Sequence, residues 1–161
     1  VEHPPGTRIV VTSEKGRRRI VLPAIGFNMG VVFMAVFGLV FGGVGAVTRA
    51  PIGVNRTLPE TRRMLEQCME EVLAVGLARG VAMIDNAVAE SMSILDSIGA
   101  NATASLQRDI AEGRPTELDY WNGAVVRLGR EAGVATPVNS FIYRSLMPLH
   151  LQAVGKVKFP A

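Results

Sequence analysis

The segment from Thr116 to Arg127, which reads TELDYWNGAVVR, carries side chains that could do chemistry. Thr116 is a candidate helix N-cap, and Asp119 follows three residues later, as in a capping box with Asp in place of Glu or Gln. This pattern predicts a helix from Thr116 to about Ala132, with Glu117 in its first turn. Because the positive end of a helix dipole favours an ionised acid, Glu117 is a candidate to meet a polar ligand.

Several other helices are needed to position this segment. Apolar residues recur at helical spacing after Pro59, and Gly80 suits the position beyond a last turn, so we expect a helix from Pro59 to Arg79. Gly133 marks the end of the helix that Thr116 begins. Further helices are predicted over residues 85–99, 103–112 and, from a cap at Asn139, 139–146. The predicted fold is an all-α helical bundle with a short irregular or β N-terminal segment, in which residues 8–12 favour a strand.

The composition indicates an ordered chain and gives little support for a nucleic-acid partner. With 161 residues, 48% of them hydrophobic, the chain is long enough for one domain with a real core. The expected division is an unassigned N-terminal segment, 1–24, and a helical domain, 25–161. The net charge is only +3, and the basic cluster of Lys15 and Arg17–Arg19 lacks interleaved aromatic residues. We therefore expect this cluster to lie in a solvated loop.

The run from Ile20 to Thr48 contains no charged residue and admits two interpretations. Its length would allow one helix to span a bilayer, and Gly38, Gly42 and Ala46 would let two helices approach closely. A helix that is apolar all round is buried in protein or in lipid, and we expect this run to lie in a protein core or a dimer interface, with the membrane span as the alternative. The first interpretation predicts a membrane location and the second a cytoplasmic protein.

The metal-binding and redox signals are weak. Cys68 is the single cysteine, and its apolar helical neighbours predict a buried structural thiol. His3 and His150 lie near opposite ends of the chain, so no metal site is predicted. No glycine-rich phosphate-binding turn follows a predicted strand.

Several short blocks, in order and at matching spacing, resemble the C-terminal domain of the ketopantoate reductase (2-dehydropantoate 2-reductase) family. The resemblance extends from about Gly42 to Pro148. Its blocks are Thr48–Gly53, Pro59–Arg62, Ser105, Thr116–Asp119, Asn122–Gly123 and Thr136–Asn139.

This resemblance implies a fold, a substrate and a set of roles. The fold would be the 6-phosphogluconate-dehydrogenase-like helical domain, which closes over ketopantoate while a separate domain holds NADPH, in pantothenate biosynthesis. Ser105 would hydrogen-bond the substrate, with Asp109 and Asn122 supporting the substrate site. Glu117 would be the catalytic side chain and would orient substrate or cofactor. Each of these residues also fits a plain structural role on a helix, and a homodimer is expected.

The chain departs from the family in two ways. The family has a lysine that stabilises the negative charge developing on the carbonyl oxygen. The corresponding residue here is Met34, and methionine cannot donate a proton. Gly38 and Gly42 stand where the family has asparagines. Residues 1–41 are also too few for a dinucleotide-binding domain.

Three functions therefore remain open. The chain could be the substrate domain of an NADPH-dependent 2-dehydropantoate 2-reductase, inactive alone because the cofactor domain and the lysine are missing. It could be a non-catalytic helical dimerisation module derived from that family. It could be a membrane-anchored protein with one spanning helix at 20–48.

Overall fold

The computed structural model describes residues 10–14, 17–21 and 29–160, with side chains from residue 38 onward. The chain divides into two units, 1–32 and 33–161. In the first, β1 (Val10–Glu14) pairs antiparallel with β2 (Arg17–Val21), with Val10 opposite Val21. The strand predicted at 8–12 is confirmed for its described residues, 10–12. The loop predicted for Arg17–Arg19 is wrong, because these residues form part of a strand; Lys15 lies outside the described residues.

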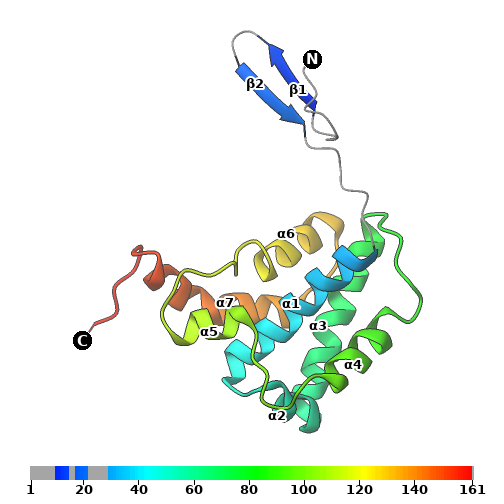
Figure 1. Ribbon diagram of the computed structural model, residues 1–161, viewed down its shortest axis with the longest axis vertical. Coiled ribbons are helices and arrows are strands. Elements are labelled where there is room, and N and C mark those ends of the chain that lie inside the picture. The colour runs from blue at the N-terminus through cyan, green and yellow to red at the C-terminus, as the bar shows by residue number, and fades with distance from the viewer. Residues whose placement is uncertain (1–9, 15–16, 22–28, 161) are drawn as a thin grey trace. The chain divides into compact units, whose positions relative to one another are not determined.

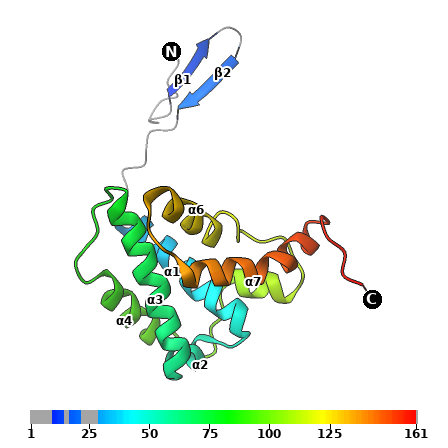
Figure 2. The same ribbon diagram turned by 180° about the vertical axis from the view of Figure 1, so that it is seen from behind.

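The second unit is the helical bundle that the sequence predicts (Figures 1 and 2). Its α3 contacts α2, α4, α6 and α7, and both views show α4 beside α3. The helices are α1 (Met29–Thr48), α2 (Ile52–Thr57), α3 (Pro59–Ala78), α4 (Ala87–Ser97), α5 (Ser105–Ala111), α6 (Asn122–Ala132) and α7 (Pro137–Ala153).

Local signals set most helix ends. Pro59 begins α3, and Gly80 and Gly133 follow α3 and α6 with φ of 76° and 69°, the left-handed conformation that glycine adopts most readily. The predicted end of the last helix is wrong. α7 begins at Pro137, so Asn139 lies inside the first turn, and the helix continues through Pro148 to Ala153. Proline removes one backbone hydrogen bond, but here it does not end the helix.

The apolar run at 20–48 is shared between the two units. Ile20 and Val21 belong to β2, so one continuous helix over the run is wrong. Side chains of α1 from Leu39 to Ala46 are buried in the bundle, which confirms the core interpretation for these residues. Within the described parts of the chain, none of the helices combines the length and apolarity that crossing a bilayer requires.

A buried carboxylate fixes the start of α7 against α3. Glu71, whose exposed fraction is 8%, accepts hydrogen bonds from the backbone amides of Val138 (2.7 Å) and Asn139 (2.9 Å) and from the Asn139 side-chain amide (2.7 Å). These backbone amides lack partners within their own helix, so Glu71 caps α7 from another element. The Cys68 thiol donates to Asn139 Oδ1 at 3.4 Å, and burial raises its pKa far above the usual range. The prediction of a buried structural thiol is confirmed.

We expect Glu71→Ala to lower the free energy of unfolding by about 3 kcal/mol, because three buried donors lose a charged acceptor. Urea denaturation followed by circular dichroism measures the change. Glu70→Ala is the matched control: Glu70 is exposed and pairs with Arg63, so its loss should cost less than about 1 kcal/mol. Equal losses in the two variants would contradict the role of Glu71.

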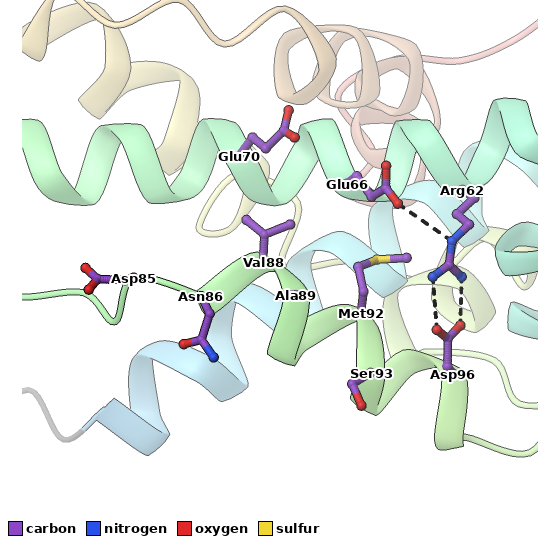
Figure 3. Close-up of a pocket in the computed structure, with 10 residues that line it drawn as sticks. All are labelled: Arg62, Glu66, Glu70, Asp85, Asn86, Val88, Ala89, Met92, Ser93 and Asp96. Carbon is purple, nitrogen blue, oxygen red and sulfur yellow. Dashed lines mark hydrogen bonds and ion pairs between the residues drawn. The ribbon is translucent and has the colours of Figure 1, made fainter.

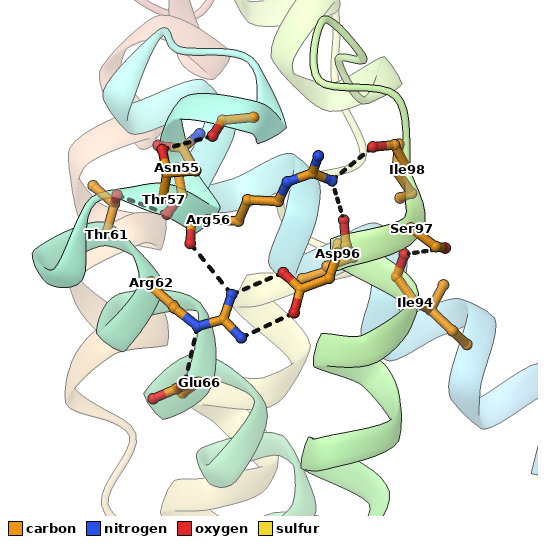
Figure 4. A network of polar contacts seen from close by, with 12 residues as sticks. Asn55, Arg56, Thr57, Thr61, Arg62, Glu66, Ile94, Asp96, Ser97 and Ile98 are labelled. Atoms are coloured by element: carbon orange, nitrogen blue, oxygen red, sulfur yellow. Dashed lines mark hydrogen bonds and ion pairs between the residues drawn. The ribbon is translucent and has the colours of Figure 1, made fainter.

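Two arginines tie α2, α3 and α4 together (Figure 4). Arg56 Nη1 donates to the carbonyls of Leu95 (2.7 Å) and Ile98 (2.6 Å) at the end of α4. Arg62 binds both carboxylate oxygens of Asp96, at 2.8 and 3.0 Å, and also donates to the carbonyl of Arg56 at 3.2 Å. The hydrogen bonds from Arg62 lower the pKa of Asp96 below its ordinary value.

This shift predicts a pH dependence of stability. A carboxyl whose pKa is lower in the folded state stabilises the fold above its unfolded pKa, about 4, and this contribution disappears as the pH falls through the folded value. We expect Asp96→Asn to show a shallower fall in urea midpoint below about pH 4 than the unchanged chain. Asp85→Asn, which removes an exposed acid outside this network, should keep the original slope.

Candidate active site

The segment between α5 and α6 folds as a turn, not as the predicted helix start. Residues 117–121 are non-helical and α6 begins at Asn122, so the capping box at Thr116 and the place of Glu117 in a first helical turn are wrong. Tertiary partners explain the difference. Thr116 Oγ1 pairs with His150 Nδ1 at 3.0 Å, and the Asp119 carboxylate accepts a 2.6 Å hydrogen bond from the Tyr143 hydroxyl. Both side chains are thus held by α7 and not by a capping box.

The predicted site residues occupy different environments. Ser105 is exposed and begins α5, while Glu117 is exposed in the turn. The backbone carbonyl of Glu117 accepts from the amide of Trp121 at 3.1 Å, which closes the turn. Asp109 accepts two hydrogen bonds from Arg114, at 2.9 and 2.7 Å. Among the described residues, no hydrogen bond or ion pair joins Ser105 to Glu117, so their convergence on one ligand stays a prediction.

Asn122 lies in the core between three helices. It is fully buried, and its Nδ2 donates to Asn139 Oδ1 on α7 at 3.2 Å. On the α1 side, a Cβ atom added to Gly43 would lie 3.2 Å from Asn122 Nδ2. The amide therefore links α6 to α7 at a point where α1 has no side chain, and its proposed role toward a substrate remains a prediction.

The face of α1 that carries Gly38 and Gly42 is covered by side chains from other elements. A Cβ atom added to Gly38 would overlap the ring of Trp121, which precedes α6. A Cβ atom added to Gly42 would lie 3.1 Å from Leu106 Cβ on α5. Trp121 and Leu106 therefore use space that larger side chains at positions 38 and 42 would need. Sequence patterns did not identify either residue, because neither has a local signal of tertiary contact.

Near Gly123 of α6, the Asp119 carboxylate and the Tyr143 phenol form a hydrogen-bonded pair. The hydrogen bond to Asp119 raises the pKa of Tyr143 above its ordinary value. Arg127 Nη1 lies 3.6 Å from the same carboxylate and Arg127 Nη2 donates to the Asp119 carbonyl at 3.1 Å. These contacts hold the turn to α6 and α7. Met34 lies on α1, but its side chain is outside those described.

A pocket of about 630 Å³ between α3 and α4 lies apart from these residues (Figure 3). Four of its ten lining residues are acidic, namely Glu66, Glu70, Asp85 and Asp96, and Arg62 binds Asp96. In the described part of the chain, no group of three or more His, Cys, Asp or Glu side chains is arranged to hold a metal ion. The pocket therefore supplies no metal centre.

Gly38→Ala should displace the Trp121 ring and lower the free energy of unfolding by about 1–2 kcal/mol, because an added methyl group overpacks the contact. Trp121 is the single tryptophan of the chain, so its fluorescence emission should shift to longer wavelength as the ring moves toward water. In a Trp121→Ala background, the further loss caused by Gly38→Ala should largely disappear, because the overlapping ring is gone.

Gly99→Ala is the control for that measurement, since a Cβ atom there meets nothing within 4 Å. An unchanged emission spectrum and stability in Gly38→Ala would show that the ring does not occupy this space.

Known proteins share the sequence pattern and the fold of this helical domain. Residues 30–150 match the family model described as "Ketopantoate reductase PanE/ApbA C terminal". The 2-dehydropantoate 2-reductase of Pyrobaculum aerophilum is 39% identical over 100 residues, which cover 62% of this chain and 36% of that protein. The Vibrio cholerae enzyme of the same name is 34% identical over 92 residues, covering 56% and 31%. The chain thus spans about a third of the length of the curated relatives it matches.

Solved structures show the same fold. A dimeric ketopantoate reductase from Staphylococcus aureus superposes with a TM-score of 0.74 at 22% identity, over 83% of this chain and 46% of that one. D-mandelate dehydrogenase, solved with NADH and anilino(oxo)acetate, gives a TM-score of 0.67 at 22% identity, over 78% and 70%. From the family match over most of its length, this chain belongs to the ketopantoate reductase PanE/ApbA family and contains its C-terminal helical domain.

Proposed function

We propose that this chain is the substrate domain of an NADPH-dependent reductase that converts ketopantoate to pantoate, and that it needs a separate cofactor domain to act. The observation that carries the proposal is the family match over residues 30–150, which includes α5, the turn and the start of α6. The curated relatives that share this region are named 2-dehydropantoate 2-reductases.

The proposed roles follow from the chemistry of ketone reduction. The exposed Ser105 hydroxyl can donate a hydrogen bond to the substrate carboxylate, and the exposed Glu117 carboxylate can accept one from a substrate hydroxyl. Hydride addition places negative charge on the carbonyl oxygen, which a positioned cation or proton donor must stabilise. Met34 can supply neither, so this chain leaves that step to another group.

The described residues do not fit a dinucleotide site. Phosphate binding of the Rossmann type needs a strand, a glycine-rich turn and a helix N-terminus in succession. The described strands β1 and β2 form a hairpin, and no such succession occurs in the described ranges. When NADPH is held by another domain, it supplies the hydride, and the residues of this chain would bind and orient the keto acid.

A second proposal is a non-catalytic helical dimerisation module. It is favoured by Met34 at the lysine position and by the packing of Trp121 and Leu106 over Gly38 and Gly42. A domain that no longer binds the keto acid has no need for side chains at these two positions. The same face would then serve only to join α1 to α5 and α6.

Fluorescence of Trp121 distinguishes the two proposals, since the ring lies on the face in question. We expect ketopantoate to change the emission saturably, and Ser105→Ala and Glu117→Gln to weaken the affinity by about tenfold each. NADPH alone should give no saturable change, and the chain should not oxidise NADPH in the presence of ketopantoate.

Asp85→Asn is the control for the loss of an exposed acid, and it should leave the titration unchanged. No response to ketopantoate, together with a dimer in sedimentation, would favour the non-catalytic module. Steady turnover by the purified chain would overturn both the need for a second domain and the loss of the proton donor.

A further inference from the structure

A second pocket lies at the C-terminal end of α1, where α1, α5 and α7 meet. Its volume is about 380 Å³, within the range of sites for small molecules. Ala46, Ile110 and Leu149 give it apolar walls, while Arg49, Gln107 and Gln152 are its polar side chains. It shares no lining residue with the face covered by Trp121 and Leu106, and none of the proposed substrate residues lines it.

The charge of this pocket comes from one residue. Arg49 is exposed, and its side chain forms no ion pair or hydrogen bond with the described part of the chain. No acidic side chain lines the pocket. Because Arg49 is the charged side chain in its lining, the pocket favours an anion over a cation. Guanidinium groups bind carboxylates through two parallel N–H donors, which makes a carboxylate a suitable partner.

The backbone holds Arg49 in an unfavourable conformation. Its φ is 58°, and it is the one non-glycine residue with positive φ in the described ranges. Arg49 directly follows α1, a position where glycine is common because it adopts this conformation without strain.

Neighbouring bonds fix this corner. The carbonyl of Ala50 accepts from Asn55 Nδ2 at 2.9 Å and from Gln107 Nε2 at 3.2 Å, and the Ala50 amide donates to Thr48 Oγ1 at 3.3 Å. Gln107 is thereby held between the corner and the pocket. These hydrogen bonds fix the backbone next to residue 49. Glycine would adopt the backbone conformation at this position without strain, but the chain has an arginine there.

We propose that this pocket binds a small monocarboxylate with an apolar body, with Arg49 holding the carboxylate and Ala46, Ile110 and Leu149 contacting the body. The site is separate from the proposed keto-acid site, and its occupancy does not depend on NADPH.

The test is a titration of the whole chain with hexanoate, followed by chemical shifts of backbone amides. Hexanoate should bind at least tenfold more tightly than the neutral hexan-1-ol and more tightly than inorganic phosphate, because it alone has both the charge and the apolar body. Arg49→Gln should weaken hexanoate binding by about tenfold to a hundredfold. Arg130→Gln removes an exposed arginine of α6 that does not line the pocket, and it should leave hexanoate binding unchanged.

Arg49→Gly separates binding from folding. It should weaken hexanoate binding as Arg49→Gln does, while its unfolding midpoint stays equal to or above that of the unchanged chain, since glycine relieves the strained φ. Ser105→Ala and Glu117→Gln should bind hexanoate normally, so failure of the keto-acid proposal would not affect this one.

Three results would overturn the proposal. They are equal binding of hexanoate and hexan-1-ol, wild-type hexanoate affinity in Arg49→Gln, and no saturable shift up to millimolar hexanoate. Phosphate binding as tight as that of hexanoate would overturn the assignment of an apolar body.

Discussion

The bundle depends on the burial of one carboxylate without a cation. Glu71 lies in the middle of α3, and the donors that it accepts from are neutral amides at the start of α7. A buried charge is costly unless hydrogen bonds replace its water, so α3 and α7 can pack only in the register that supplies these amides. Asn139 extends the constraint to α6 through Asn122, and Asn122 in turn lies against Gly43 of α1. Hydrogen bonds thus join α3, α7 and α6 through the core, and α1 packs against the last residue of this chain of contacts.

This connection also determines where the candidate site lies. Because Asn122 is fixed in the core, the turn that precedes it must leave the core at that point, which brings Trp121 against α1. Asp119 is held two residues earlier by Tyr143. Glu117 therefore lies on a turn that is anchored at both Asp119 and Asn122.

The sequence predicted the features whose causes are local. Pro59, Gly80 and Gly133 act through their own backbone conformations, so the ends that they mark could be read from the chain. The turn at 117–121 could not be predicted from the sequence. It is stabilised by the hydrogen bond from Tyr143, which lies on α7, far along the chain. The strand through Arg17 was missed for a similar reason, since its pairing partner, and not its composition, makes it a strand.

The candidate site shows the same limit. The residue blocks around Thr116–Asp119 indicate the family by their order and spacing along the chain, which are properties of the sequence itself. The contacts of Trp121 and Leu106 with α1 depend on how three helices pack together. Spacing along the chain does not specify this packing.

The glycines of α1 make the stability of this helix depend on its neighbours. Glycine inside a helix costs about 0.8–1 kcal/mol relative to alanine, and Gly38, Gly42, Gly43 and Gly45 all lie within α1. This half of α1 has little tendency to form a helix by itself. Its helical conformation therefore depends on Leu106, Gln107 and Asn122, which fill the space beside the glycines, more than on the propensity of its own residues.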